Sequence, residues 1–114
     1  MPRRRWRYYG TVGGSQPVRE FLSALEPDDR LTVRAAMALV AEEGQRSARH
    51  IRRDIYEVRT SREGRTFRVL FSAEGHRQYV LLALSAFEKK SRKTPPAEID
   101  LAETRLREWR RRRT

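Results

Sequence analysis

The sequence predicts a single α+β domain in which an antiparallel sheet packs against helices, in the order βααβββα. Three observations predict this fold. The length of 114 residues fits one domain, residues 1–114, with one modest core. Apolar residues recur with helical spacing in two early segments and in a final one. Between them, three runs rich in aromatic and β-branched residues are separated by short connectors that contain glycine.

The first half of the chain predicts one strand and a short helix. RWRYYGTV, residues 5–12, is rich in aromatic residues and stops at two glycines, as is typical of a strand. Pro17 suits the first turn of a helix that ends before Pro27. The apolar stripe of this helix consists of Val18, Phe21, Leu22 and Leu25.

A longer helix follows, and the two helices are expected to form a hairpin. Asp28 or Asp29 is the expected cap at its N-terminus, and Gly44 is the stop signal. The expected buried face of this helix consists of Leu31, Ala35, Ala38 and Leu39.

The second half of the chain predicts an antiparallel meander and a last helix. The meander strands are residues 54–60, 65–72 and 78–87. Thr94 is the expected cap of a helix that starts at Pro95 and Pro96. One face of this helix carries Ile99, Ala102, Leu106 and Trp109. The Arg-rich tail, about residues 110–114, is expected to be a solvated helix end, and an accessory grip on RNA backbone is the second interpretation.

The charge of the chain favours a polyanionic partner. The net charge is +11, and phosphates attract such a surface over long distances, so nucleic acid is the expected ligand. A bias toward arginine codons explains most of the arginine excess but not its distribution. Residues 15–45 hold three Arg against six acids, whereas residues 46–68 hold eight Arg against three acids.

Several classes of chemistry are not expected. The chain has no cysteine, and its two separate histidines do not supply a zinc site, so we expect no metal and no cofactor. The longest apolar run, residues 79–87, is too short to span a bilayer. The Arg-rich start lacks the apolar core of a signal peptide. The expected location is the cytoplasm, with no membrane partner.

Strand alternation gathers charged side chains on one face of the predicted sheet. Glu57 and Arg59 point to the same side, because successive side chains of a strand alternate. In the next strand the odd-numbered residues from Phe67 to Phe71 are apolar, so Arg68 projects to the opposite, solvent-facing side. Pairing of the strands places Glu57, Arg59 and Arg68 on one surface. An ordinary cross-strand salt-bridge ladder explains these three residues when they are taken alone.

The three lysines of the chain add a second feature. Lys89, Lys90 and Lys93 lie within one five-residue window, whereas every other basic position among the 26 is arginine. A lysine ammonium is a compact charge that donates a proton more readily than a guanidinium, which suits phosphate clamping instead. This window is therefore a candidate source of a proton donor, although a solvated loop is the simpler interpretation.

Several stretches together resemble a known family. IYEVR, FRVLF and the strand that runs into AFEKKSRKTPPAEIDLA are similar to the phage-derived HigB-like branch of the RelE/ParE toxin superfamily. The resemblance covers roughly residues 5–110 and is strongest over residues 55–102. It implies a RelE-like fold and the toxin of a type II toxin-antitoxin module. The implied activity is that of a ribosome-dependent mRNA endonuclease, and the implied partners are mRNA on the ribosome and a cognate antitoxin with a helix-turn-helix domain.

The resemblance also implies roles for individual residues. Arg59 and Arg68 are expected to hold the scissile phosphate, Glu57 stands where some relatives place a carboxylate base, and Lys89 or Lys90 stands in the acid region. The cleavage is expected to proceed without a metal, by attack of a 2′-hydroxyl on the neighbouring phosphate. Four neighbouring cations are expected to bind RNA: Arg52, Arg53, Arg92 and Lys93.

Two other functions stay open from the sequence. A non-catalytic RNA-binding or ribosome-binding module would grip phosphate with the same face without cleaving it. A ParE-like protein of the same fold would instead inhibit a protein target such as DNA gyrase.

Overall fold

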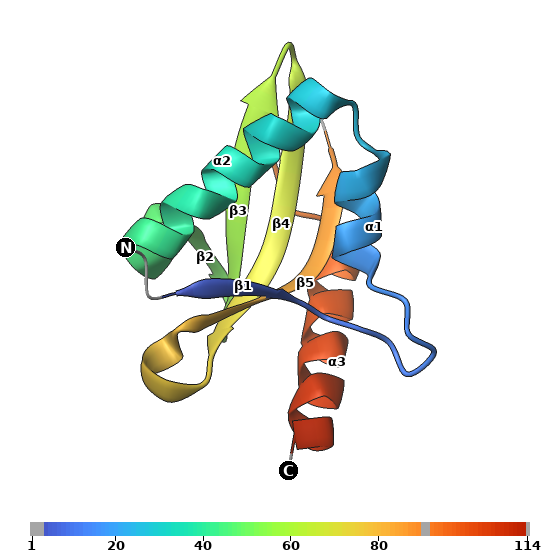
Figure 1. The fold of residues 1–114 in the computed structure, drawn as a ribbon, viewed down its shortest axis with the longest axis vertical. Helices are drawn as coiled ribbons and strands as arrows, with labels where there is room; N and C mark the ends of the chain where they lie inside the picture. The colour runs from blue at the N-terminus through green and yellow to red at the C-terminus, as the bar shows by residue number, and fades with distance from the viewer. Residues whose placement is uncertain (1–3, 90–91, 114) are drawn as a thin grey trace.

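The computed structural model describes residues 4–89 and 92–113. Its elements are β1 (Arg5–Tyr8), α1 (Pro17–Ala24), α2 (Pro27–Glu43), the 3₁₀ turn η1 (Gly44–Ser47), β2 (Arg49–Arg52), β3 (Ile55–Arg62), β4 (Arg65–Glu74), the 3₁₀ turn η2 (His76–Gln78), β5 (Val80–Glu88) and α3 (Pro96–Arg113). The α+β class is confirmed, with five strands in one sheet and helices on both of its faces (Figure 1).

The sheet has the strand order β1-β5-β4-β3-β2. The predicted meander is present as β3, β4 and β5, which pair antiparallel in sequence order. At one edge β1 pairs parallel to β5, so the sheet is mixed rather than wholly antiparallel. At the other edge β2 pairs with β3. The sequence analysis did not predict β2, because its four residues are mostly charged and show no apolar alternation.

Two apolar clusters lie on opposite faces of the sheet. On one face α1 and α2 pack over side chains such as Val58, Val69 and Phe71. On the other face α3 packs over Ile55 and Leu70. Figure 1 shows α2 and α1 crossing one side of the sheet, with α3 reaching the other side from the end of β5. The neighbouring positions on each strand therefore serve two different cores.

The helix predictions are confirmed for α1 and α3 but wrong for the buried face of α2. All four predicted apolar residues of α3 are buried. In α2, Leu31 and Leu39 are 65% and 50% exposed, and the buried stripe is formed instead by Val33, Met37, Val40 and Ala41. Apolar residues occur on both sides of this helix, so its periodicity does not decide which side faces the sheet. The N-cap is Glu26, rather than Asp28 or Asp29, and it makes no capping hydrogen bond through its side chain.

One further boundary differs from expectation: the first strand ends at Tyr8 rather than at residue 12. The Arg-rich tail continues α3 as far as Arg113, and Arg111, Arg112 and Arg113 are exposed, so the expected solvated helix end is confirmed. Its first member, Arg110, donates to the carboxylates of Glu74 and Asp54 at 2.8 and 2.9 Å, which ties this end of α3 to the sheet.

Candidate active site

The structure brings the three predicted strand residues together. Arg59 on β3 lies directly opposite Arg68 on β4, and Glu57 lies two residues earlier on the same strand as Arg59. The intervening residue Val58 and its partner Val69 belong to the core under α1 and α2, so the charged residues share the α3 face. The predicted alternation of β3 and β4 is therefore confirmed.

The charged face is not open to solvent as expected. Arg68 and Glu57 are each only 1% exposed, although the sequence analysis placed them on an accessible surface. The sheet carries a second helix layer on this face, which the alternation of one hairpin does not reveal. Arg59 is the more accessible member, with 31% of its side chain exposed.

Glu57 joins the sheet to the segment that carries the lysines. Its Oε2 accepts a hydrogen bond from the Thr94 hydroxyl at 2.6 Å, and its Oε1 accepts one from Arg59 Nε at 3.2 Å. Arg59 Nη2 in turn donates to the backbone carbonyl of Arg92 at 2.7 Å. Two contacts therefore fix Arg92 and Thr94, at the end of the lysine window, onto β3. Below, these four residues, Glu57, Arg59, Arg92 and Thr94, are called the latch.

Thr94 is consequently not the helix cap that the sequence predicted. The helix α3 begins at Pro96, so Pro95 rather than Thr94 precedes it. The N–H groups of Glu98 and Ile99 in its first turn donate to the Pro95 carbonyl, while the Thr94 hydroxyl donates to Glu57. The sequence analysis missed this contact because a threonine before two prolines has the same local pattern whether it caps a helix or bonds a distant strand.

The electrostatics of the face favour an incoming anion. The pKa of the Arg68 guanidinium is lowered, first by burial and then by the positive charge of Arg59, with a smaller effect in the same direction from Arg49. Glu57 opposes this shift. Arg59 and Arg49 thus place positive charge beside Arg68, and Arg59 is partly exposed, so this face would attract an anion such as a phosphate.

Arg49 is a residue of this site that sequence reasoning missed. It lies on β2, directly opposite Glu57 in the strand register. The available signal was the excess of arginine over residues 46–68, but without β2 there was no reason to place Arg49 beside Glu57. Its position adds a third arginine to the face that carries Arg59 and Arg68.

The lysine window begins where β5 leaves the sheet. A bulge in β5 shifts the register between Leu70 and Phe71, so the residues from Ser85 onward change faces. Phe87 then packs on the α3 side, and alternation places Lys89 on that same side. The Lys89 N–H donates to the Thr66 carbonyl at 2.9 Å, which fixes its backbone at the edge of the charged face.

Of the other predicted residues of this window that the structure describes, Arg92 belongs to the latch and Lys93 lies beside it. Lys90 falls outside the described residues. Arg92 and Lys93 are exposed at the start of the segment that the latch holds. The structure therefore places Lys89, Arg92 and Lys93 around the same end of the sheet as Arg59.

The two other predicted RNA-binding residues have carboxylate partners. Arg52 Nη2 donates to Glu103 at 2.6 Å and to Asp100 at 2.7 Å, and Arg53 bonds both oxygens of Glu103. The hydrogen bond from Arg52 is the main reason why the pKa of the Glu103 carboxyl is lowered, while burial acts against it. These arginines connect the β2 edge of the sheet to α3. In the strand register Arg52 lies opposite Ile55, so these contacts are made near Ile55 and not near Arg59.

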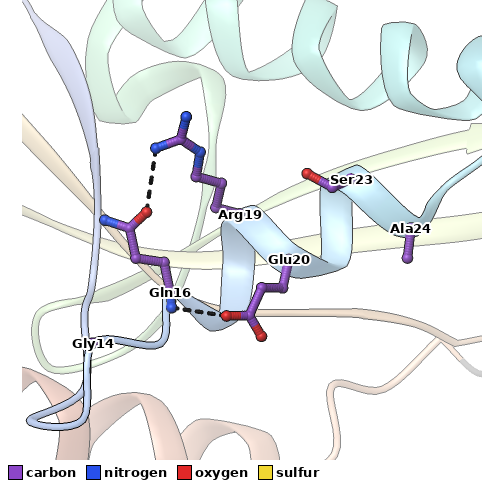
Figure 2. A pocket seen from close by; sticks show the side chains of 6 residues that line it. All are labelled: Gly14, Gln16, Arg19, Glu20, Ser23 and Ala24. Carbon is purple, nitrogen blue, oxygen red and sulfur yellow. Dashed lines mark hydrogen bonds between the residues drawn. The ribbon is translucent and has the colours of Figure 1, made fainter.

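A shallow pocket of about 520 Å³ lies elsewhere, along α1 (Figure 2). Its lining includes Arg19 and Glu20 but none of the predicted site residues. Arg19 donates to the Gln16 side chain at 3.3 Å, and Glu20 accepts from the Gln16 backbone at 3.1 Å. These contacts stabilise the start of the helix, so we do not place the chemistry there.

Over residues 4–89 and 92–113, no three acidic or histidine side chains cluster in a way that would hold a metal ion. Within the same ranges, no helix is both long and apolar enough to cross a membrane.

The mixed sheet with two helix layers agrees with the α+β fold that the resemblance to HigB/RelE toxins implies. The family comparison agrees: the chain belongs to the Gp49-like family of phage-derived proteins (DUF891), whose model matches residues 20–107. The chain is 32% identical over 109 residues to a protein named "Probable endoribonuclease HigB1" in two strains of Mycobacterium tuberculosis, CDC 1551/Oshkosh and ATCC 25618/H37Rv. Each alignment covers 93% of this chain and 85% of the relative. The resemblance recognised from the sequence is thereby confirmed.

Proposed function

We propose that this protein is the toxin of a type II toxin-antitoxin module and a metal-independent endoribonuclease that cleaves mRNA on the ribosome. The observation that carries the proposal is the pairing of Arg59 with Arg68 across β3 and β4, with Arg59 partly exposed, at the edge where Lys89 leaves the sheet. The likeness to the mycobacterial proteins named as probable endoribonucleases supports the same chemistry.

In the proposed reaction a 2′-hydroxyl of RNA attacks the adjacent phosphorus, its proton passes to solvent, and the bond to the 5′-oxygen breaks. Arg59, whose side chain is partly exposed, stabilises the negative charge that accumulates on the phosphorane oxygens, and the buried Arg68 opposite it adds positive charge at the same place. Lys89 or Lys90 protonates the leaving 5′-oxygen, and Arg92 and Lys93 contact the RNA outside the reacting phosphate. RNA binding by Arg52 and Arg53 stays a prediction, because carboxylates of α3 already pair with both of them. Side chains clamp the phosphate and protonate the leaving oxygen, so the step requires no metal.

The expected role of Glu57 as a base stays a prediction, and its contacts favour a positioning role. Both carboxylate oxygens accept hydrogen bonds, from Thr94 and Arg59, and the side chain is covered. A base must reach the proton that it removes. We therefore propose that Glu57 acts through Arg59 and Thr94, by holding the clamp and the lysine segment in one arrangement.

The proposed partner is a cognate antitoxin that carries a helix-turn-helix domain. The high positive charge of the toxin favours an acidic contact surface on the antitoxin, because opposite charges speed association and fix its register. We place both proteins in the cytoplasm, where translation takes place.

The test is cleavage of a translated mRNA on purified ribosomes by the full chain and by Arg59→Ala. Arg59 is partly exposed but pairs with the buried Glu57, so its truncation should cost about 1–3 kcal/mol, and rates are compared well below the Tm that thermal melting gives for the variant. We expect a rate loss of roughly 10²-fold or more, because one clamp donor is removed. The matched control is Arg34→Ala, which removes an exposed arginine from α2 on the other side of the sheet.

Two results would replace the proposal. RNA that binds tightly but stays intact with the wild-type protein would support the non-catalytic module. Translation that proceeds normally while growth stops would support a ParE-like action on a protein target. Equal cleavage rates for wild-type and Arg59→Ala proteins would remove the paired arginines Arg59 and Arg68 from the site.

A further inference from the structure

A second basic site lies at the far end of α3, in a pocket of about 370 Å³ between β1 and the helix C-terminus. Arg7 comes from β1, Arg112 and Arg113 come from α3, and Tyr8 and Trp109 supply aromatic walls. No Asp or Glu is among the described residues that line this pocket. Its volume falls in the range of pockets that hold small ligands or single nucleotides.

Two of the three arginines of this pocket differ from those of the β2 edge in their partners, whereas Arg112 has a 3.3 Å ion pair with Glu108. Arg52 and Arg53 are neutralised by carboxylates of α3, as described above. Within residues 4–89 and 92–113, Arg7 and Arg113 have no carboxylate within ion-pair distance. Their charge is therefore available to an external anion.

Aromatic rings hold these guanidinium groups in place. The Arg113 guanidinium carbon lies 4.5 Å from the centre of the Trp109 ring, and that of Arg7 lies 6.0 Å from it. Arg112 is fixed through a 2.6 Å hydrogen bond from Nη2 to the Gly10 carbonyl. Because the cations are ordered before a ligand arrives, less side-chain entropy is lost on binding.

We propose that this pocket, lined by Arg7, Arg112, Arg113 and Trp109, binds the phosphate backbone of RNA as a second contact outside the cleavage site. A guanidinium fork matches a phosphate with two hydrogen bonds, and a guanidinium that lies flat on an aromatic ring presents its outer face to a base. Charge, ordered planar cations and aromatic walls together favour RNA over an acidic peptide, which offers carboxylates but no bases.

The two sites are far enough apart to act independently. The helix α3 has 18 residues, from Pro96 to Arg113, so its first and last residues are roughly 25 Å apart at a rise of about 1.5 Å per residue. That distance equals about seven phosphates of one strand at roughly 3.4 Å each. The pocket thus adds affinity for the RNA or ribosome substrate without touching the reacting phosphate. The ligand class of this inference rests on the proposed function, but its test measures binding alone and does not require cleavage.

The test measures binding of the full chain to a single-stranded 2′-O-methyl oligonucleotide of about 20 nucleotides, which has no free 2′-hydroxyl to attack. The double variant Arg7→Gln/Arg113→Gln should bind roughly tenfold more weakly, and the slope of log K against log salt should fall by about 1.4, or about 0.7 per lost phosphate contact. The control Arg34→Gln/Arg46→Gln removes the same charge from exposed positions on α2 and η1. It should keep the wild-type slope.

Equal affinities and salt slopes for the pocket variant and the control would overturn the inference. It would also be overturned if the pocket variant bound the oligonucleotide like wild type but lost affinity for the co-expressed antitoxin, since the site would then serve an acidic protein. A wild-type protein that binds this probe but cleaves no RNA on ribosomes would instead refute the proposed function and leave the pocket in place.

Discussion

Replacing Glu57 by glutamine keeps the shape of a buried side chain and removes its negative charge. The amide oxygen can still accept from Arg59, and the amide N–H can donate to the Thr94 hydroxyl, so both contacts survive in weaker form, the first without its ion-pair attraction and the second as a neutral bond. Glu57 is also the charge that opposes the lowered pKa of Arg68. The substitution therefore leaves Arg59 and Arg68 side by side with less compensation.

The magnitude follows from these contacts. A hydrogen bond to a charged group contributes about 1.5–3 kcal/mol, against about 0.5–1.5 for a neutral one, so the Thr94 bond loses about 1 kcal/mol, and the lost ion-pair attraction to Arg59 costs about 1 kcal/mol more. The repulsion between Arg59 and Arg68, which Glu57 no longer offsets, adds about 1 kcal/mol, a low figure because the partly exposed side chain of Arg59 is screened by water. A total of about 3 kcal/mol corresponds to a fall in Tm of about 10 °C for a domain of this size.

The assay is urea unfolding and thermal melting of Glu57→Gln beside Glu63→Gln. Glu63 is an exposed carboxylate on the β3–β4 turn with a 3.5 Å ion pair to Arg62, and its substitution should change stability by less than about 0.5 kcal/mol. A loss below about 1 kcal/mol for Glu57→Gln would refute the latch, because it would mean that the carboxylate does not hold the two segments together.

The same variant separates the two roles of Glu57 in cleavage. If Glu57 positions Thr94 and Arg59, Thr94→Val should lower the cleavage rate as Glu57→Gln does, and the double variant should cost little more than either single one. If Glu57 is the base, Glu57→Gln should lose roughly 10²–10⁴-fold while Thr94→Val keeps most of the activity. Rates are compared well below each variant's Tm, so that unfolding does not contribute.

Three further predictions concern other parts of the molecule. Arg68→Met should keep stability within about 1 kcal/mol, because burial and Arg59 already disfavour the cation. Yet it should lower cleavage on ribosomes by roughly 10²-fold, and a fully active Arg68→Met protein would exclude Arg68 from the clamp. The pKa of Glu103 is lowered in the folded state, so its ion pair stabilises the protein above the ordinary carboxyl range and is lost as the pH falls through the folded pKa. Urea unfolding below roughly pH 4 should therefore show a smaller difference between wild type and Glu103→Gln than at pH 7, and an equal difference at both would contradict this linkage. Leu106→Ala should cost about 2–5 kcal/mol in urea unfolding because it empties the core under α3, and a smaller loss would show that this core collapses around the gap.

Local patterns were sufficient where one side of an element is clearly apolar. The alternation around Phe67 correctly assigned Arg68 to the other face, and the spacing from Ile99 to Trp109 correctly identified the buried side of α3. The same reasoning failed for α2, where Leu31 and Leu39 form an apolar stripe that lies outside the core. Periodicity shows that a helix has an apolar stripe, but which stripe is buried depends on how the helix packs against the sheet.

The sequence by itself determined the α+β class, the β3–β4–β5 meander, the family and the side of the sheet that carries Glu57, Arg59 and Arg68, because these depend on local spacing and on motifs. Only the tertiary structure decided that Arg68 is buried, that Thr94 bonds Glu57 instead of capping α3, and that β2 brings Arg49 beside them. Each of these depends on contacts between segments far apart in the chain. Such contacts form when α3 and the edge strands close over the hairpin, and no local pattern encodes the energy that selects them.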